Sequence, residues 1–141
     1  MRTSILYLSL VFVISCGKDP NVMVDHINGY WEIQEVTMEN GLKKQYAYND
    51  TIDYIQLNDS LIGFRKKLKP GFNNTYTTSK DAEAITGKIE DNSLVLYYKT
   101  PYAEWTETVI DANDEYLTIM NENKAVYLYK RYQSLKLDIE E

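Results

Sequence analysis

The first segment with a strand pattern reads Asn28-Gly29-Tyr30-Trp31-Glu32-Ile33-Gln34-Glu35-Val36-Thr37. Alternate side chains of a strand point to the same face of a sheet, so Trp31 and Ile33 share one face. The following Glu39-Asn40-Gly41 is typical of a turn, which ends the segment. We therefore expect a strand over residues 30–37 with one buried face.

Short apolar and aromatic segments of the same kind continue to Arg131, separated by turns rich in Asn, Asp and Gly. No stretch between Trp31 and Arg131 shows helical spacing over about eleven residues. Consecutive strands with short links favour antiparallel neighbours. The sequence therefore predicts an all-β fold, an antiparallel up-and-down meander of eight or nine strands that closes into a barrel. The further expected strands are 52–57, 61–68, 74–79, 85–90, 93–99, 104–110, 116–120 and 124–131.

Residues 1–15 contain one positive charge, Arg2, before an apolar run that starts at Ser4. This order is typical of a secretory signal peptide. As a helix the run would be about 18 Å long, too short for the ~30 Å hydrocarbon core of a bilayer. Val13-Ile14-Ser15-Cys16 resembles a bacterial lipobox. The resemblance implies cleavage after Ser15 and lipidation of Cys16 with diacylglycerol and an N-terminal acyl chain such as palmitate.

The residues after Cys16 indicate where the anchored protein resides. Gly17 stands where inner-membrane lipoproteins typically have Asp, which favours the outer membrane. Gly17-Lys18-Asp19 resembles part of the surface-export tag of lipoproteins from the Bacteroidota, although Pro20 replaces its second acid. The periplasmic face and the cell surface both stay open. The expected organisation is a signal peptide over 1–15, lipidated Cys16 and a polar tether over 16–28, a barrel domain over 29–132 and a tail over 133–141.

Composition narrows the class of function. The formal charge is −6 at pH 7, and removal of Arg2 with the signal peptide makes it more negative. This balance argues against nucleic acid as a partner, because nucleic-acid binding needs clustered basic residues. Cys16 is the only cysteine, so no disulfide forms within the domain and packing alone holds its core. Thirteen Tyr beside three Pro and six Gly favour strands.

Two positions carry a resemblance to a known family. Gly29-Tyr30-Trp31 opens the first expected strand and Arg131 ends the last. These residues resemble the Gly-x-Trp of lipocalins and the Arg that covers its indole, a contact worth about 0.5–2 kcal/mol. With its lipobox, the chain resembles the small lipocalin-like lipoproteins of the Bacteroidota. It departs from typical lipocalins in having no disulfide and only a short tail after the strands.

The resemblance implies a barrel whose interior either binds one small ligand or is filled by its own side chains. Strand alternation places Trp31, Ile89, Val109 and Ile119 inside. Glu107 falls on the same face, where a carboxylate is costly unless it is paired. It is either a polar contact in a cavity or the structural partner of an Arg or Lys. The expected cavity residues are Ile33, Ile55, Leu57, Phe64, Ile85, Trp105, Glu107 and Leu117.

Catalytic and metal-binding patterns are weak in this sequence. His26 is the only histidine and lies in the expected tether, so no Cys or His remains in the barrel for nucleophilic catalysis or zinc. Carboxylates are abundant, but no pattern holds two of them at the separation that glycoside hydrolysis needs. We therefore expect no metal, no cofactor and no enzymatic activity.

Three surface features suggest interactions or modification. Phe64-Arg65-Lys66-Lys67-Leu68-Lys69 is the one basic cluster. It is either a contact for anionic lipid or an acidic partner, or an edge strand protected by lysines. Asp50-Thr51-Ile52 and Asp59-Ser60-Leu61 each resemble an O-glycosylation acceptor of the same bacterial group, which predicts glycans on Thr51 and Ser60.

Two functions follow from these patterns. The first is a lipid-anchored envelope lipoprotein whose lipocalin-like barrel binds a small apolar or amphiphilic ligand. The alternative is a non-enzymatic structural or accessory surface lipoprotein that contacts an envelope protein through the barrel rim and residues 64–69. No motif in the sequence specifies the ligand, the partner protein or the cellular process.

Overall fold

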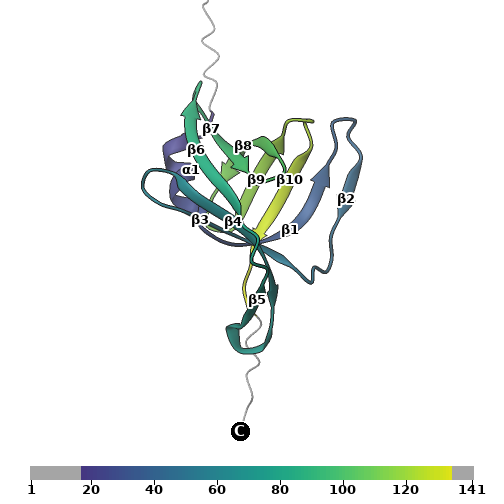
Figure 1. Cartoon of the computed structure of the whole chain (residues 1–141). Helices are drawn as coiled ribbons and strands as arrows, with labels where there is room; N and C mark the ends of the chain where they lie inside the picture. Colours follow the sequence, from purple (N-terminus) through teal and green to yellow (C-terminus); the bar gives the residue numbers. More distant parts are fainter. Residues whose placement is uncertain (1–16, 135–141) are drawn as a thin grey trace, which may run out of the picture.

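The computed structural model describes residues 17–134. The expected signal peptide, Cys16 and the tail beyond Ser134 lie outside the described residues. The described chain forms one antiparallel sheet, eight strands of which close into a barrel (Figure 1), which confirms the predicted fold class. The elements are α1 (Pro20–Ile27), β1 (Gly29–Thr37), β2 (Lys43–Gln45), β3 (Ile52–Leu57), β4 (Ile62–Pro70), the short 3-10 turn η1 (Phe72–Asn74), β5 (Tyr76–Thr78), β6 (Glu83–Glu90), β7 (Ser93–Lys99), β8 (Glu104–Ala112), β9 (Tyr116–Asn121) and β10 (Val126–Arg131).

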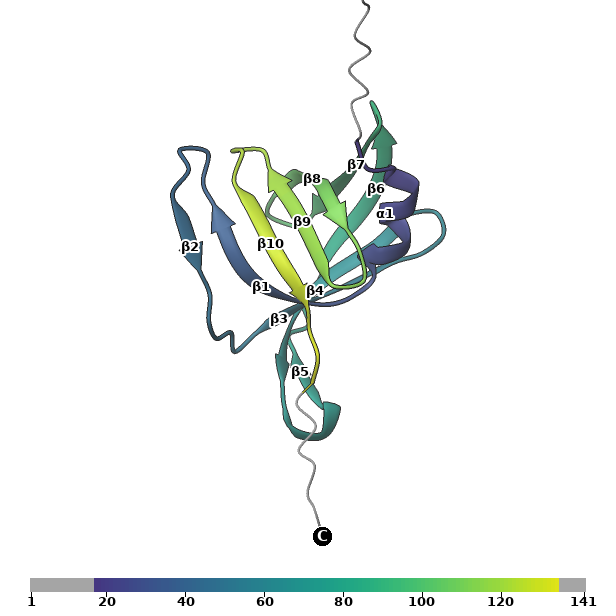
Figure 2. The same cartoon turned by 180° about the vertical axis from the view of Figure 1, so that it is seen from behind.

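The barrel closes because β1 pairs with both of its neighbours in space. From Trp31 to Thr37 it pairs with β10, with Trp31 opposite Arg131. Its first residues pair with β3, whereas its last residues pair with β2. β2 and β5 each pair with one barrel strand only and project beyond the barrel (Figures 1 and 2). Closure removes the open edges that a sheet of this length would otherwise present.

The two projecting strands differ most from the sequence-based expectation. β2 is a three-residue strand in which every residue is exposed, so it has no apolar alternation by which it could be predicted. The expected strand over 74–79 shortens to β5, which pairs only with the end of β4. The other expected strands agree with the structure to within about two residues, the usual uncertainty of strand ends.

The prediction of a polar tether over 16–28 is wrong for most of its length, because Pro20–Ile27 folds as α1. Asp19 caps the helix by accepting a hydrogen bond from the Asn21 amide at 2.9 Å, and Pro20 occupies its first turn. Met23 and Ile27 lie four residues apart, on one face of the helix, and both are buried. α1 packs on β3, β7 and β8 and covers one end of the barrel (Figure 2). Only Gly17, Lys18 and Asp19 remain as a described polar lead.

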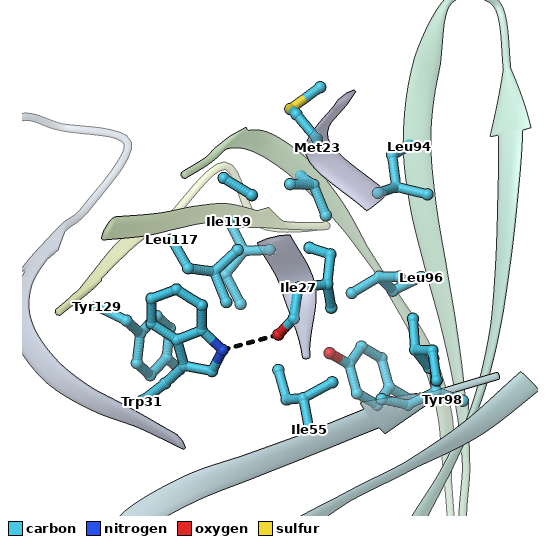
Figure 3. Close-up of a cluster of buried hydrophobic side chains, with 14 residues drawn as sticks. Met23, Ile27, Trp31, Ile55, Leu94, Leu96, Tyr98, Leu117, Ile119 and Tyr129 are labelled. Carbon is cyan, nitrogen blue, oxygen red and sulfur yellow. Dashed lines mark hydrogen bonds between the residues drawn. The ribbon is translucent and has the colours of Figure 1, made fainter. Parts of the chain in front are cut away.

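The apolar core lies next to α1 and extends along the barrel interior to Tyr98 and Tyr129. Ile27, Trp31, Leu94, Leu96 and Leu117 are each fully buried there (Figure 3). The remaining members of the core cluster are Met23, Ile55, Leu57, Ile85, Tyr98, Val109, Ala112, Ile119 and Tyr129.

No helix within residues 17–134 is both long enough and apolar enough to cross a bilayer.

Replacing Ile27 by Ala will test the role of α1 as a core element. Ile27 is 0% exposed, so the cavity should lower the free energy of unfolding by about 2–5 kcal/mol. Val22→Ala, on the same helix but 55% exposed, should change it by less than about 0.5 kcal/mol. Urea unfolding followed by circular dichroism measures both. Equal effects for the two variants would show that α1 does not contribute to the core.

Candidate functional site

The closed end of the barrel is organised around Trp31. Its ring Nε1 donates a hydrogen bond to the Ile27 carbonyl at 2.8 Å, which fixes the end of α1 against β1 (Figure 3). The Arg131 guanidinium lies over the indole, 3.9 Å from the ring centroid. Arg131 also donates to the carbonyls of Asn28 and His26, at 2.7 and 3.0 Å. The expected Trp31–Arg131 pair therefore lies at the seam where β10 meets β1.

The same contact explains the glycine of the Gly-x-Trp sequence. Gly29 has φ +131°, a conformation that L side chains rarely adopt. A Cβ atom at this position would overlap the guanidinium of Arg131. Gly29 is therefore required both by the backbone conformation and by the arginine that covers Trp31.

The opposite half of the barrel interior carries polar side chains. α1 contacts β3, β7 and β8, and Asn28, which follows the helix, hydrogen-bonds the backbone of Leu57 at the end of β3. Towards the other ends of these strands the inward positions are occupied by charged and aromatic residues. They are Asp53 on β3, Arg65 and Lys67 on β4, Glu83 on β6, Tyr98 on β7, Trp105 and Glu107 on β8, and Tyr127 and Tyr129 on β10. We call this set the inner polar cluster.

Arg65 is the centre of the inner polar cluster. Its side chain is 11% exposed, and its Nε donates to Glu83 at 2.5 Å. Its other contacts are an Nη1 donation to Glu107 at 3.3 Å and a guanidinium placed 4.4 Å from the ring centroid of Tyr98. Two carboxylates and one aromatic face therefore already satisfy this cation.

Asp53 is the most buried carboxylate of the cluster, with 3% exposure. Lys67 donates to its Oδ2 at 2.8 Å and lies 2.7 Å from Oδ1. The Lys67 side chain is 62% exposed, whereas that of Asp53 is 5% exposed. The ammonium of Lys67 therefore pairs with both carboxylate oxygens of Asp53.

Aromatic rings form the rest of the wall. Tyr98 and Trp105 stack in parallel with ring centroids 5.1 Å apart. Burial, the largest cause, raises the pKa of the Tyr98 phenol well above its usual range, although the Arg65 charge acts against the shift. Burial and then the Asp53 carboxylate raise the pKa of Tyr129 in the same way. Both phenols therefore stay neutral hydrogen-bonding groups at ordinary pH.

The structure separates the expected cavity residues into three groups. Four of them form part of the closed core beside α1. Ile33 and Trp105 are only partly buried, at the edge of this core, and Glu107 faces Arg65. The prediction that Phe64 lines the cavity is wrong. Phe64 pairs with Gln56 on the outer face and contacts Tyr54 edge-on. The four core residues are Ile55, Leu57, Ile85 and Leu117.

The register of the strands clarifies two further expectations. Ile89 pairs with the buried Leu94 and so lies on the inner face as expected, but it is 42% exposed near the end of β6. Strand alternation splits the basic residues over 64–69 between two faces, and the structure places Arg65 and Lys67 opposite Ile55 and Asp53 on the inner face. Phe64 was predicted to lie inside because it is aromatic. The pairing of β4 with β3 instead places its neighbour Arg65 inside, opposite Ile55.

Five residues of the inner polar cluster were not placed inside the barrel by the sequence interpretation: Asp53, Glu83, Tyr98, Tyr127 and Tyr129. The sequence did contain a signal for Asp53, because it alternates with the inward Ile55 and Leu57.

Thr51 and Ser60, the expected glycosylation sites, are exposed, and their modification stays a prediction. Residues 17–134 hold no group of three His, Cys, Asp or Glu side chains placed for a metal ion.

A surface cleft of about 370 Å³ is bordered by the core residue Tyr98 and by Trp105. Most of its lining residues, including Thr86, Tyr97 and Thr106, occupy outward positions of β6, β7 and β8. A smaller hollow of about 220 Å³ lies beside Arg131 and Tyr116. Neither hollow lies among the inner polar cluster, apart from the Tyr98 and Trp105 positions that border the first.

A comparison with protein-family models agrees with this architecture. A family model described as "Lipocalin-like domain" matches residues 27–119, from the end of α1 into β9. A crystal structure of a lipocalin-like protein from Bacteroides uniformis ATCC 8492 aligns with a TM-score of 0.48 and 11% identity, over 74% of this chain and 97% of that chain. No match was found among curated proteins.

The raised pKa of Tyr98 predicts a specific loss of stability at alkaline pH. Above about pH 10 the unfolded chain releases the phenolic proton while the folded protein keeps it, so the unfolded state is favoured as pH rises. The buried phenol should contribute a fall of about 1.4 kcal/mol per pH unit. Tyr98→Phe should make the decline shallower by that amount.

Urea unfolding between about pH 9 and about pH 11.5 measures this slope. Tyr102→Phe is the matched control, because Tyr102 is 96% exposed and should leave the slope unchanged. An identical slope for Tyr98→Phe and the parent protein would contradict the burial of the phenol.

Proposed function

The chain belongs to the lipocalin-like domain family, and from this membership we propose that its barrel binds a small apolar or amphiphilic ligand at the end remote from α1. We further propose that the protein is a non-enzymatic lipoprotein, held at the bacterial outer membrane through lipid on Cys16. The face of that membrane, periplasmic or external, is left to experiment.

The observation that carries the binding proposal is the unequal filling of the barrel. The half beside α1 is packed with buried apolar side chains. In the other half, Ile33, Trp105 and Tyr127 occupy inward positions and yet are only partly buried. Because these rings and methyl groups face inward, their exposure indicates access from the open end. Partly exposed aromatic groups beside a few placed polar atoms are typical of small-molecule sites.

The closed half also limits the ligand. Trp31 and Leu96 are fully buried across the barrel axis, so no chain penetrates as far as α1 without displacing them. Displacement of close-packed core side chains is costly. The proposed ligand is therefore short, and its polar part lies among the inner polar cluster.

The lead before α1 supports a defined orientation on the membrane. Only Gly17, Lys18 and Asp19 separate Cys16 from the helix. Lys18 pairs with Asp111 on β8, and Asp19 caps α1, so the lead is held against the barrel. Three residues span at most about 11 Å. A lipid on Cys16 would therefore place the α1 end towards the membrane and the open end away from it.

Exposed apolar side chains on the projecting segments favour protein contact as a second function. Leu42 and Tyr48 flank β2 and are 67% and 85% exposed, and Phe72 in η1 is 82% exposed. Large exposed apolar side chains are characteristic of contact surfaces when they gather in a patch. We propose that the exposed side chains of either projecting segment would contact a partner protein in place of the basic strand first expected.

Native mass spectrometry of the membrane-extracted protein tests the binding proposal. We expect a small molecule of constant mass in one-to-one proportion. Trp105→Ala should reduce its occupancy at least tenfold, because the ring forms part of the open end. Tyr102→Ala, in the exposed turn before β8, should leave occupancy unchanged. Protein that stays empty under several growth conditions and with added alkyl probes would contradict ligand binding.

Metabolic labelling with palmitate tests the anchor. We expect label on the parent protein and none on Cys16→Ser, which should also leave the membrane fraction. Retention of label by Cys16→Ser would contradict the proposed site. Protease treatment of whole cells then distinguishes the external face of the outer membrane from the periplasmic face.

A further inference from the structure

We propose that the surface cleft over β6, β7 and β8 binds a neutral sugar ring. Most of its lining residues occupy outward positions of these strands, so this site is separate from the barrel interior. The cleft encloses about 370 Å³, near the lower end of the about 300–1,000 Å³ that is usual for small-molecule pockets. It is therefore large enough for one ring with its substituents.

The lengths and directions of the side chains explain why the outer face is hollowed here. Thr86 and Thr106, both short, stand opposite Tyr97 on its two sides. The Tyr97 hydroxyl donates a hydrogen bond at 2.6 Å to Glu90, the last residue of β6. The Tyr97 side chain therefore leans along the sheet, away from Lys99 at the end of β7. The two threonines are too small to fill the space that it leaves.

Glu122 forms a fixed wall of the cleft. This residue follows β9, and its Oε1 accepts hydrogen bonds from the amide and the hydroxyl of Thr106, at 2.9 and 3.0 Å. The pairing of β8 with β9 begins only at Glu107, so these two bonds join the segments where the strand ladder is absent. A side chain that is already held in place loses little freedom when a ligand binds. Glu122 is therefore preorganised.

The hydrogen-bonding groups of the cleft suit hydroxyl groups. Thr106 donates its one hydroxyl hydrogen to Glu122, so its Oγ1 is left as an acceptor. Both bonds to Glu122 end on Oε1, so Oε2 keeps its capacity to accept. Lys99 lies 2.7 Å from Glu104 and has further hydrogens to donate. A hydroxyl both donates and accepts, so neighbouring hydroxyls of one ligand match both kinds of group.

The spacing of these groups suits a six-membered ring. The pairs Tyr97–Thr106 and Lys99–Glu104 lie two residues apart along β7 and β8, which is about 7 Å. Hydroxyls on opposite sides of a pyranose ring span a comparable distance. Tyr97 adds aromatic atoms to the border of the cleft, and the C–H groups of a sugar pack on such atoms.

Charged ligands suit the cleft less well. An anion would approach the carboxylates of Glu104 and Glu122, and the one lysine of the lining is already paired. An ammonium group only donates, so it would leave the Lys99 donors without an acceptor. Lys99 and Glu104 are also 73% and 68% exposed, and charge attraction at such exposed positions is weak. A neutral ligand with several hydroxyls is therefore favoured over an ion.

The methyl glycosides of glucose, galactose and mannose test the proposal. Each is added at about 10 mM, enough to detect a Kd of about 1 mM. Binding is followed by the amide NMR shifts of the isotopically labelled full protein, in a detergent without a sugar headgroup. We expect at least one of the three to shift the amides of Thr86, Tyr97 and Thr106. No shift with any of them, or shifts confined to inward residues such as Leu96, would overturn the inference.

Further probes test the chemical class of the ligand. Glucuronate carries a negative charge on the same kind of ring, and cyclohexanol keeps the ring size with one hydroxyl. We expect both to bind at least about fivefold more weakly than the best glycoside, because each lacks part of the hydrogen-bonding match. Equal or tighter binding of either probe would contradict the proposal. The corresponding disaccharide then distinguishes a free sugar from the end of a longer glycan, since only the glycan gains affinity from a second ring.

Substitutions locate the site. Thr106→Val keeps the β-branched shape and removes the Oγ1 acceptor, so it should weaken the best glycoside at least about fivefold. Thr108→Val, two residues further along the outer face of β8 and outside the cleft, is the matched control and should leave the affinity unchanged. Ala84→Phe, at an exposed position of the lining, fills the cleft and should abolish the shifts. Undiminished binding by the folded Thr106→Val and Ala84→Phe variants would show that the sugar binds elsewhere.

Discussion

The contact of Arg131 with Trp31 is the interaction on which the rest of the structure depends. It joins the first and last barrel strands, and the Trp31 Nε1 donation to Ile27 brings α1 to the same point. The Arg131 guanidinium and the Trp31 ring, together with the carbonyls of His26, Ile27 and Asn28, therefore hold residues about a hundred positions apart. Long-range closure is entropically costly, so a seam with several directed contacts has a large effect on whether the barrel closes.

Closure at one end determines what the other end is able to do. With α1 and Trp31 in place, the apolar requirement of the fold is met in half of the barrel. The strands continue beyond this core for several residues, and their inward positions there carry Asp53, Arg65 and Glu107. The proposed binding function would therefore be separated from stability along the barrel axis. A preorganised site loses less entropy when a ligand binds.

The sequence predicted the parts of the molecule that depend on local pattern. Gly29, Trp31 and Arg131 were identified because a short motif, a strand start and a strand end coincide. Phe64 was misplaced because the phase of β4 is determined by pairing with β3, which the local sequence does not encode. α1 was missed because eight residues are too few for helical periodicity to be distinguished from a tether. The pairing of Asp53 with Lys67 joins two strands, so the local sequence does not show it.

The buried charges of the barrel depend on their partners. A buried ion pair is often no more stabilising than apolar side chains of the same volume. This barrel nevertheless places three carboxylates and two cations on its inner face. Removal of one partner would leave a buried charge without its counter-ion, which is strongly destabilising. Arg65 with Glu83 and Glu107, and Lys67 with Asp53, therefore hold neighbouring strands together as charge pairs whose members are required together.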